Sequence, residues 1–318
     1  IDIALWDIKG KMANMPVYQL LGGAYRKAVP VYRHVDGADV EEIADQIAYY
    51  RDLGVKHLRV QSGGYGGGLD LKAPKSYDGI YLNSREYIRK TVKLFEDLRA
   101  KIGFDIDLVH DVHERIAPSE AIELARALEP CHLFFLEDPL PLNQTEYFKN
   151  MRALTSTPIA EGELFNNEAQ YRDLIINRLI DFIRVHITQI GGITPAYKLA
   201  VFAEQFGVRT AWHGPGDMSP LAHAANIHID LAVPNFGVQE WSGIRPPNFV
   251  IQELSGPEGA LLEVFDGLPE FRDGYVYPNE RPGLGIILNE KAAAKYPNHD
   301  EVTTWTMTRN RDGGLVLP

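Results

Sequence analysis

Three acidic residues recur at equal spacing through the middle of the sequence. Asp111 stands in HDVH, Glu137 in LEDP and Glu163 in AEGEL, with 26 residues from each to the next. Each follows an apolar run typical of a buried strand, so equal spacing over repeated strand–helix units predicts that they end neighbouring strands at one level. Three converging carboxylates repel one another and are costly to bury. A divalent cation relieves that cost, and all-oxygen ligation favours Mg²⁺.

Two neighbouring acids are alternative ligands. Glu161 shares a strand face with Glu163, whereas Asp138 precedes a proline and, by strand alternation, is expected to point away from Glu137. The other interpretation of the trio is that each carboxylate caps a following helix or pairs with an arginine.

His113 lies two residues after Asp111, so both side chains are expected to point into the same site. A histidine beside a metal carboxylate can act as a general acid or base, because its ordinary pKa is near neutrality. It could instead be a fourth metal ligand or a histidine that only makes structural hydrogen bonds.

A tyrosine in a glycine-rich stretch is the candidate base. Arg59 and Gln61 end the second expected strand, and Tyr65 follows in GGYGGG. A nearby arginine stabilises a phenolate and so makes tyrosine a usable base. Tyr77 and Tyr81 compete for this role, and a packed aromatic side chain is the alternative.

A buried cation on the sixth strand suggests how an anionic substrate is held. Arg184 needs an anionic partner there, which could be a substrate carboxylate, a metal ligand, or a structural salt bridge with Glu163 or Glu240. Glu240, which ends the eighth strand, or Asp217, which follows the seventh, could accept substrate hydroxyls, and His213 ends the seventh strand in WHGPGD. His34, at the end of the first strand, could reach a substrate or be a core or surface histidine.

Eight short apolar runs alternate with amphipathic stretches along the chain. The expected strands are 29–35, 57–61, 105–113, 133–139, 158–164, 181–187, 209–214 and 237–241, and the clearest helices are 39–53, 85–101, 118–129, 194–206 and 219–232. This rhythm predicts an α/β fold with parallel strands and right-handed crossovers. A barrel is preferred to a Rossmann sheet, because no suitable glycine-rich turn follows the first strand.

Three divisions of the chain follow. Residues 1–28 are expected to form a helical segment, 29–243 the barrel, and 244–318 a Pro- and Gly-rich segment that wraps outside the barrel. The barrel carries a lid-like insertion at 62–84, where the strand spacing lengthens.

Composition excludes several classes of partner. The formal net charge of the 318 residues is −11 and no long basic run occurs, so binding to nucleic acid or to an anionic membrane is not expected. Cys131 is the single cysteine, which fits a reducing compartment and a cytoplasmic location. No signal peptide or membrane-spanning run is visible.

Several motifs occur together in an order that resembles the mannonate dehydratase group of the enolase superfamily. They are IDIALWDIKGK, LLGG, HDVHER, LEDP, AEGE, QIGGIT, WHGPGD and QEW, and they extend over nearly the whole chain. The resemblance implies a (β/α)₇β barrel, which is a modified TIM barrel, and a homo-oligomer. It also implies a capping domain, largely missing from this sequence, from which residues 1–28 lead into the barrel and toward which residues 244–318 wrap back. It also extends to D-galactonate dehydratase family members of the starvation-sensing protein type.

The resemblance also implies roles for the residues. Asp111, Glu137 and Glu163 would bind Mg²⁺, Tyr65 assisted by Arg59 would be the base, His113 the acid, and His34, Arg184, His213, Asp217 and Glu240 the substrate contacts. The implied reaction is removal of water from a six-carbon acid sugar, D-mannonate or D-gluconate, to give 2-keto-3-deoxy-D-gluconate.

Other chemistries fit the sequence less well. Mandelate racemase-like and muconate cycloisomerase-like members carry Lys-x-Lys where this chain has Arg59-Val60-Gln61, and an amidohydrolase would want a His-x-His motif near the first strand. A catalytically weak or inactive homologue that binds the same acid sugar is the remaining alternative.

Overall fold

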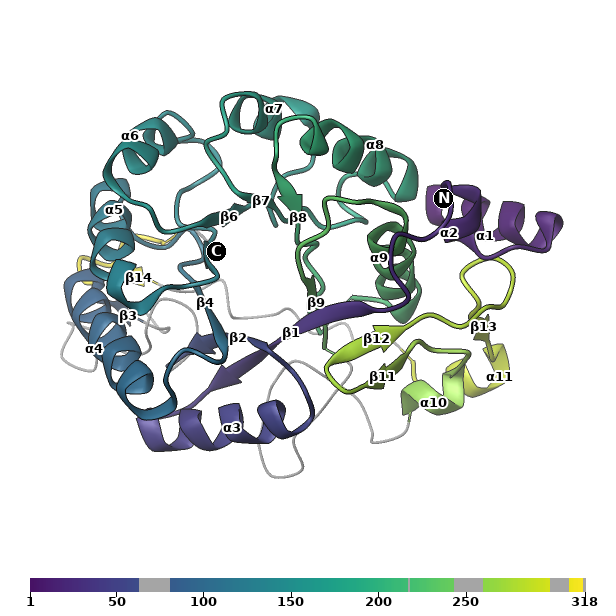
Figure 1. Cartoon of the computed structure of the whole chain (residues 1–318), viewed down its shortest axis with the longest axis horizontal. Helices are drawn as coiled ribbons and strands as arrows, with labels where there is room; N and C mark the ends of the chain where they lie inside the picture. The colour runs from purple at the N-terminus through teal and green to yellow at the C-terminus, as the bar shows by residue number, and fades with distance from the viewer. Residues whose placement is uncertain (63–80, 217, 243–259, 298–308, 317–318) are drawn as a thin grey trace.

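Eight parallel strands form the centre of the computed structural model, which describes residues 1–62, 81–216, 218–242, 260–297 and 309–316 (Figure 1). Around the sheet they follow one another in chain order. They are β1 (Val29–Asp36), β2 (His57–Gln61), β4 (Asp107–Asp111), β5 (Phe135–Glu137), β6 (Ile159–Glu161), β7 (Phe182–Ile183), β8 (Arg209–Thr210) and β9 (Gln239–Glu240).

The first and last of these strands are neighbours. β9 pairs in parallel with β1, with Val31 opposite Gln239. On the other side of β9, Thr210 of β8 donates its N–H to Asn235 O at 3.0 Å and accepts from Gly237 N at 2.8 Å. The strands therefore follow a ring, and backbone hydrogen bonds rather than a regular ladder link β8 to the segment before β9.

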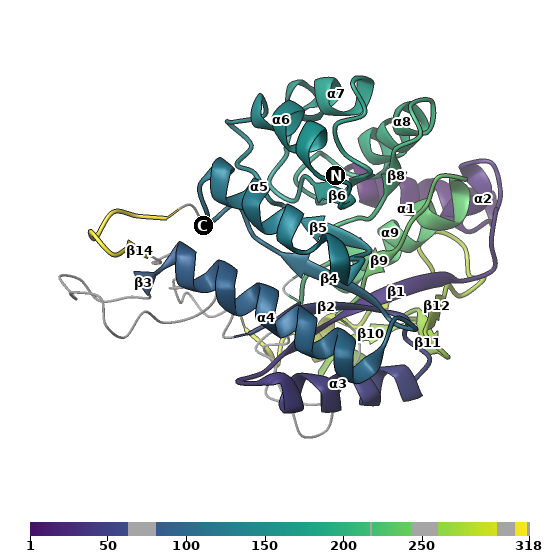
Figure 2. The same cartoon turned by 60° about the vertical axis from the view of Figure 1, so that its left-hand side comes forward.

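The helices lie outside the strands (Figures 1 and 2). They are α3 (Val40–Asp52), α4 (Ser84–Ile102), α5 (Pro118–Ala127), α6 (Tyr147–Leu154), α7 (Glu168–Ile176), α8 (Ile193–Glu204) and α9 (Pro220–Ala232). Local sequence sets where several begin: Asp39 accepts from Glu42 N at 3.0 Å and Asn83 from Glu86 N at 3.3 Å, which satisfies amide groups left free in a first helical turn. None of the helices in the described ranges is long and apolar enough to span a bilayer.

Apolar side chains fill the inside of the ring in a separate layer. The cluster consists of Tyr32, Val109, Phe135, Ala160, Phe182, Ala211 and Val238, one from nearly every strand. Because side chains on a strand alternate between faces, Asp111 shares the inner face with Val109, and Glu137 shares it with Phe135. The apolar layer thus forms a floor beneath these two carboxylates.

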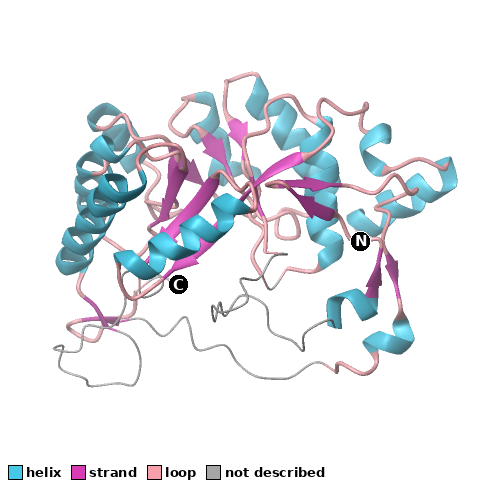
Figure 3. Cartoon of the chain, turned by 60° about the horizontal axis from the view of Figure 1, so that its bottom comes forward, coloured by secondary structure: helices cyan, strands magenta, loops and turns pink. Residues whose placement is uncertain are grey.

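Most of the remaining elements lie together on one side of this ring, at the right in Figure 1, and β3 and β14 lie at the opposite side (Figures 1 and 3). β12 (Tyr275–Tyr277) pairs antiparallel with β1 and with β11 (Glu270–Arg272), so the segment after the barrel extends the sheet on its outer side. The other elements are α1 (Asp2–Ala13), α2 (Val17–Leu20), β3 (Tyr81–Leu82), η1 (Glu129–Cys131), α10 (Ala260–Val264), β10 (Phe265–Asp266), β13 (Ile287–Leu288), α11 (Glu290–Ala293) and β14 (Arg309–Asn310).

A buried histidine joins the barrel to α2. His228 of α9 accepts a hydrogen bond from Tyr18 N at Nδ1 (3.3 Å), and its ring stacks on the Tyr18 ring with centroids 5.8 Å apart. Burial lowers the pKa of His228 to about 4, despite an opposing hydrogen bond to the Leu284 backbone. The folded protein therefore keeps this imidazole neutral.

This burial predicts a loss of stability in acid. His228 is protonated in the unfolded chain below about pH 6.5, but in the folded chain only below about pH 4. Protons therefore favour unfolding as the pH falls through this window. The His228 imidazole accounts for a loss of about 3 kcal/mol in the free energy of unfolding. We measure the free energy of unfolding in urea titrations at pH 7.5 and at pH 4. Between these two pH values it should fall by about 3 kcal/mol less in His228→Gln than in wild type. His132→Asn, at an exposed histidine, is the control. Equal acid losses in all three proteins would contradict this prediction.

Candidate functional site

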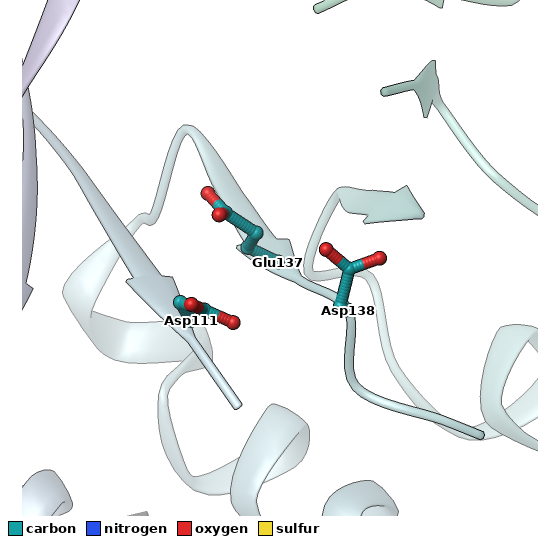
Figure 4. A group of neighbouring side chains, drawn as sticks. All are labelled: Asp111, Glu137 and Asp138. Carbon is teal, nitrogen blue, oxygen red and sulfur yellow. The ribbon is translucent and has the colours of Figure 1, made fainter. Parts of the chain in front are cut away.

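The predicted carboxylates Asp111 and Glu137 lie side by side at the ends of β4 and β5. They are directly paired in the register, and neither has measurable solvent exposure. Asp111, Glu137 and Asp138 each offer one carboxylate oxygen, and these three oxygens lie within 4.8 Å of one another (Figure 4). Asp111 Oδ1 is buried with no hydrogen-bond partner among the described residues. An unpaired buried carboxylate oxygen is costly, so this group fits a bound cation.

Asp138 corrects an expectation from strand alternation. It was expected to point away from Glu137, but its φ of 38° breaks the extended backbone at the end of β5 and brings its side chain to the same cluster. Its Oδ1 accepts from Gly162 N at 2.7 Å and its Oδ2 accepts from Arg184 at 2.5 Å. Asp138 therefore already has a donor at each oxygen.

Glu163 belongs to the same cluster, but it lies at a different level of the sheet from the one that its 26-residue spacing from Glu137 predicted. The β6 residue opposite Glu137 is Ala160, so Glu163 lies beyond the end of the strand. Gly162, with φ of 128°, turns the chain there, and a Cβ on it would lie 2.9 Å from the Phe165 ring. The expectation of equal level was wrong, because 26 residues separate Asp111 from its register partner Glu137, whereas 23 separate Glu137 from its register partner Ala160. The Glu163 carboxylate nevertheless lies 3.0 Å from His113 Nδ1.

Glu161, the alternative ligand at the end of β6, is fully buried. Both of its carboxylate oxygens have no hydrogen-bond partner among the described residues. Burial, followed by the charges of Asp138 and Glu114, raises its pKa well above the usual range. A neutral carboxyl group is therefore favoured at this position.

Arg184 is fully buried and connects most of the cluster. Its Nη1 donates to Asp138 and to Glu163 (2.6 Å), while Nη2 lies 2.8 Å from Glu137 Oε1 and 3.0 Å from Glu240 Oε2. The structural salt bridges considered for Arg184 are thus present with both Glu163 and Glu240. Its charge offsets the mutual repulsion of these carboxylates.

Arg59 occupies the other side of the cluster. Its Nη1 donates to Asp111 Oδ2 at 3.2 Å and to Glu137 Oε1 at 3.0 Å, and its Nη2 lies 2.9 Å from His34 Nδ1. Even with both guanidinium groups nearby, burial raises the pKa of Glu137 to about 7. The two arginines alone therefore leave this carboxylate poorly stabilised.

His113 is in place to carry a proton. Its Nδ1 lies 3.0 Å from Glu163 Oε1 and 3.5 Å from Asp111 Oδ2. Burial alone would lower its pKa, but the charges of Glu163 and Asp111 raise it well above the ordinary value. These carboxylates therefore favour the protonated imidazole, which is the form needed by a general acid.

The predicted substrate contacts that the structure describes lie around the same carboxylates. His34 Nε2 is 2.7 Å from Glu240 Oε1, and His213 Nε2 is 3.4 Å from Glu163 Oε2. His186, which the sequence analysis did not single out, places its ring centroid 5.1 Å from that of His213. Its position two residues after Arg184 was a usable signal, because both can face inward from one strand.

The candidate base is not placed. Tyr65, its competitor Tyr77 and the substrate contact Asp217 lie outside the described residues. Tyr81 is described and is buried in β3, where it pairs with Arg309 of β14. The assignment of the base therefore stays a prediction.

Comparison with known proteins agrees with this arrangement. The family model described as enolase C-terminal domain-like matches residues 42–292, and that of the mandelate racemase / muconate lactonizing enzyme N-terminal domain matches residues 1–22. D-galactonate dehydratase family members of Musicola paradisiaca and Enterococcus gallinarum are 48% and 46% identical to the chain, over its whole length and 78% and 77% of theirs.

A solved relative extends the comparison to structure. A crystal structure of an enolase from Pantoea ananatis, with bound D-gluconate and Mg, superposes with a TM-score of 0.92 at 45% identity. The match covers 99% of this chain and 78% of that one. The resemblance inferred from the motifs is thereby confirmed, as is the α/β fold class. The chain belongs to the enolase superfamily, as a D-galactonate dehydratase family member with an enolase C-terminal domain-like fold.

Proposed function

We propose that this protein is a Mg²⁺-dependent hydro-lyase that removes water from a six-carbon acid sugar, D-gluconate or D-mannonate, to give 2-keto-3-deoxy-D-gluconate. The observation that carries the proposal is the buried acidic cluster, with the His113 imidazole 3.0 Å from the Glu163 carboxylate. The names of the relatives and the D-gluconate in the Pantoea ananatis structure support the substrate class.

The residues present fit a magnesium ion. Asp111 has an unpartnered oxygen, and Arg59 Nη1 lies between Asp111 Oδ2 and Glu137 Oε1, a position where carboxylates converge on positive charge. With Glu163, assigned by resemblance, these residues would hold the ion. When bound, Mg²⁺ would bind the substrate carboxylate and stabilise negative charge as the proton at C2 is lost.

The protein's own groups would move the protons. Tyr65, assisted by Arg59, is proposed to remove the proton from C2, and His113 to protonate the departing 3-hydroxyl. Arg184 would balance the charge that develops on the substrate carboxylate. His34, His213, Asp217 and Glu240 are proposed to bind the sugar hydroxyls and so fix the substrate in place.

The test of function is turnover. The full-length protein is incubated with a panel of six-carbon aldonates and Mg²⁺, and 2-keto-3-deoxy products are detected. We expect His113→Asn to lower kcat by about 10²–10⁴-fold, the usual contribution of general acid–base help, with little change in substrate binding. His132→Asn, at an exposed position, should keep wild-type kcat.

Two outcomes would count against the proposal. Unchanged turnover in His113→Asn would remove His113 from the acid role. If no aldonate reacts while one still binds in calorimetry, the protein is an acid-sugar-binding homologue rather than a dehydratase.

The charge balance of the cluster predicts the effect of losing Arg184. Arg184→Met would leave Glu137, Asp138 and Glu163 without their shared donor, and breaking such a buried pair typically costs about 3–5 kcal/mol. Urea titrations in EDTA should show this loss, and Mg²⁺ should recover part of it.

Arg172→Met is the matched control for Arg184→Met. Arg172 pairs with Glu168 on the exposed surface of α7, so its loss should cost less than about 1 kcal/mol. An equal effect of the two substitutions would show that the buried cluster does not depend on Arg184.

A further inference from the structure

Tyr32 is a buried polar side chain at the bottom of the site that the proposed chemistry does not use. It lies in β1, two residues before His34, and has no solvent exposure. Its ring belongs to the apolar layer inside the ring of strands and meets the Phe135 ring edge-on, with centroids 6.0 Å apart. The hydroxyl group extends from this layer into the carboxylate cluster.

The hydrogen bonds of Tyr32 have defined directions. Arg184 Nη2 donates to the Tyr32 hydroxyl at 3.1 Å, because a guanidinium group can only donate. The phenolic proton is then available for Glu137 Oε2, at 3.2 Å. Among the described residues, Tyr32 is the one donor to that oxygen.

The two oxygens of Glu137 consequently have different surroundings. Oε1 lies between the two guanidinium groups, 3.0 Å from Arg59 Nη1, which also contacts Asp111, and 2.8 Å from Arg184 Nη2. Oε2 accepts a hydrogen bond from the neutral Tyr32 hydroxyl. A neutral hydroxyl can fix the carboxylate here without adding a positive charge that would repel the ion.

We propose that Tyr32 is a positioning residue for the metal site: its hydroxyl fixes the rotation of the Glu137 carboxylate and the place of the Arg184 guanidinium, so that Glu137 stays oriented to bind the cation. This inference rests on the proposed function only in assuming that the cluster binds a divalent ion. It predicts that Tyr32 contributes to metal affinity although it is not itself a ligand.

Tyr18 provides a matched comparison. Its hydroxyl donates to Glu280 at 2.7 Å, so it also forms a tyrosine–glutamate hydrogen bond. Tyr18 lies in α2, outside the ring of strands; its side chain is 5% exposed, and its hydrogen bond to the exposed Glu280 is partly buried. Tyr32→Phe and Tyr18→Phe therefore remove the same kind of bond, but only the first affects the carboxylate cluster.

The experiment measures binding of Mn²⁺ alone to the full-length protein by electron paramagnetic resonance. We expect Tyr32→Phe to weaken Mn²⁺ binding by roughly 10- to 100-fold, the range seen when partners of metal ligands are lost. Tyr18→Phe should bind within about twofold of wild type, whatever its effect on thermal stability. If the affinity of Tyr32→Phe for Mn²⁺ is within twofold of the wild-type affinity, the proposal is overturned.

A second variant keeps the test decisive if Tyr32→Phe does not fold. Tyr32→4-aminophenylalanine retains the ring and an N–H donor toward Glu137, so its Mn²⁺ affinity should stay within about threefold of wild type. A loss of tenfold or more in this folded variant would also contradict the proposal. Because no sugar is present, failure of every aldonate to react would reject the proposed function and leave this result unaffected.

Discussion

The structure depends on a shortage of positive charge around buried carboxylates. Asp111, Glu137, Asp138, Glu163 and Glu240 share a space that solvent hardly reaches, and the guanidinium groups that bridge them are Arg59 and Arg184. Burial is the largest cost of this arrangement, and repulsion among the carboxylates adds to it. A divalent cation offsets that cost, and the same cation is what the proposed reaction requires.

The geometry of the strands creates this shortage of positive charge around the carboxylates. The period of two places Asp111 above Val109 and Glu137 above Phe135, so an apolar layer excludes water from below. Tyr32 is the polar member of that layer, and its neutral hydroxyl donates a hydrogen bond to Glu137 without adding charge. The fold thus holds the carboxylates close together and leaves a cation as their best partner.

The sequence was most informative where the backbone is regular. Asp111 and Glu137 could be predicted, because both end extended strands whose side chains alternate. Asp138 was named as an alternative ligand, but the direction of its side chain could not be predicted, because strand alternation fails where φ is positive. Glu163 was assigned to the right cluster but the wrong level, because spacing along the chain does not fix sheet register. Tyr32 was overlooked, although it shares a strand face with His34.

The central claim is that these carboxylates bind one divalent ion. The most direct measurement is a crystal structure of the full-length protein with Mn²⁺, using anomalous scattering at the manganese edge. The account predicts a single peak with oxygens of Asp111, Glu137 and Glu163 within about 2.2 Å, near-octahedral geometry being usual for such an ion. A map with no peak there, and the carboxylates still paired with Arg59 and Arg184, would contradict it.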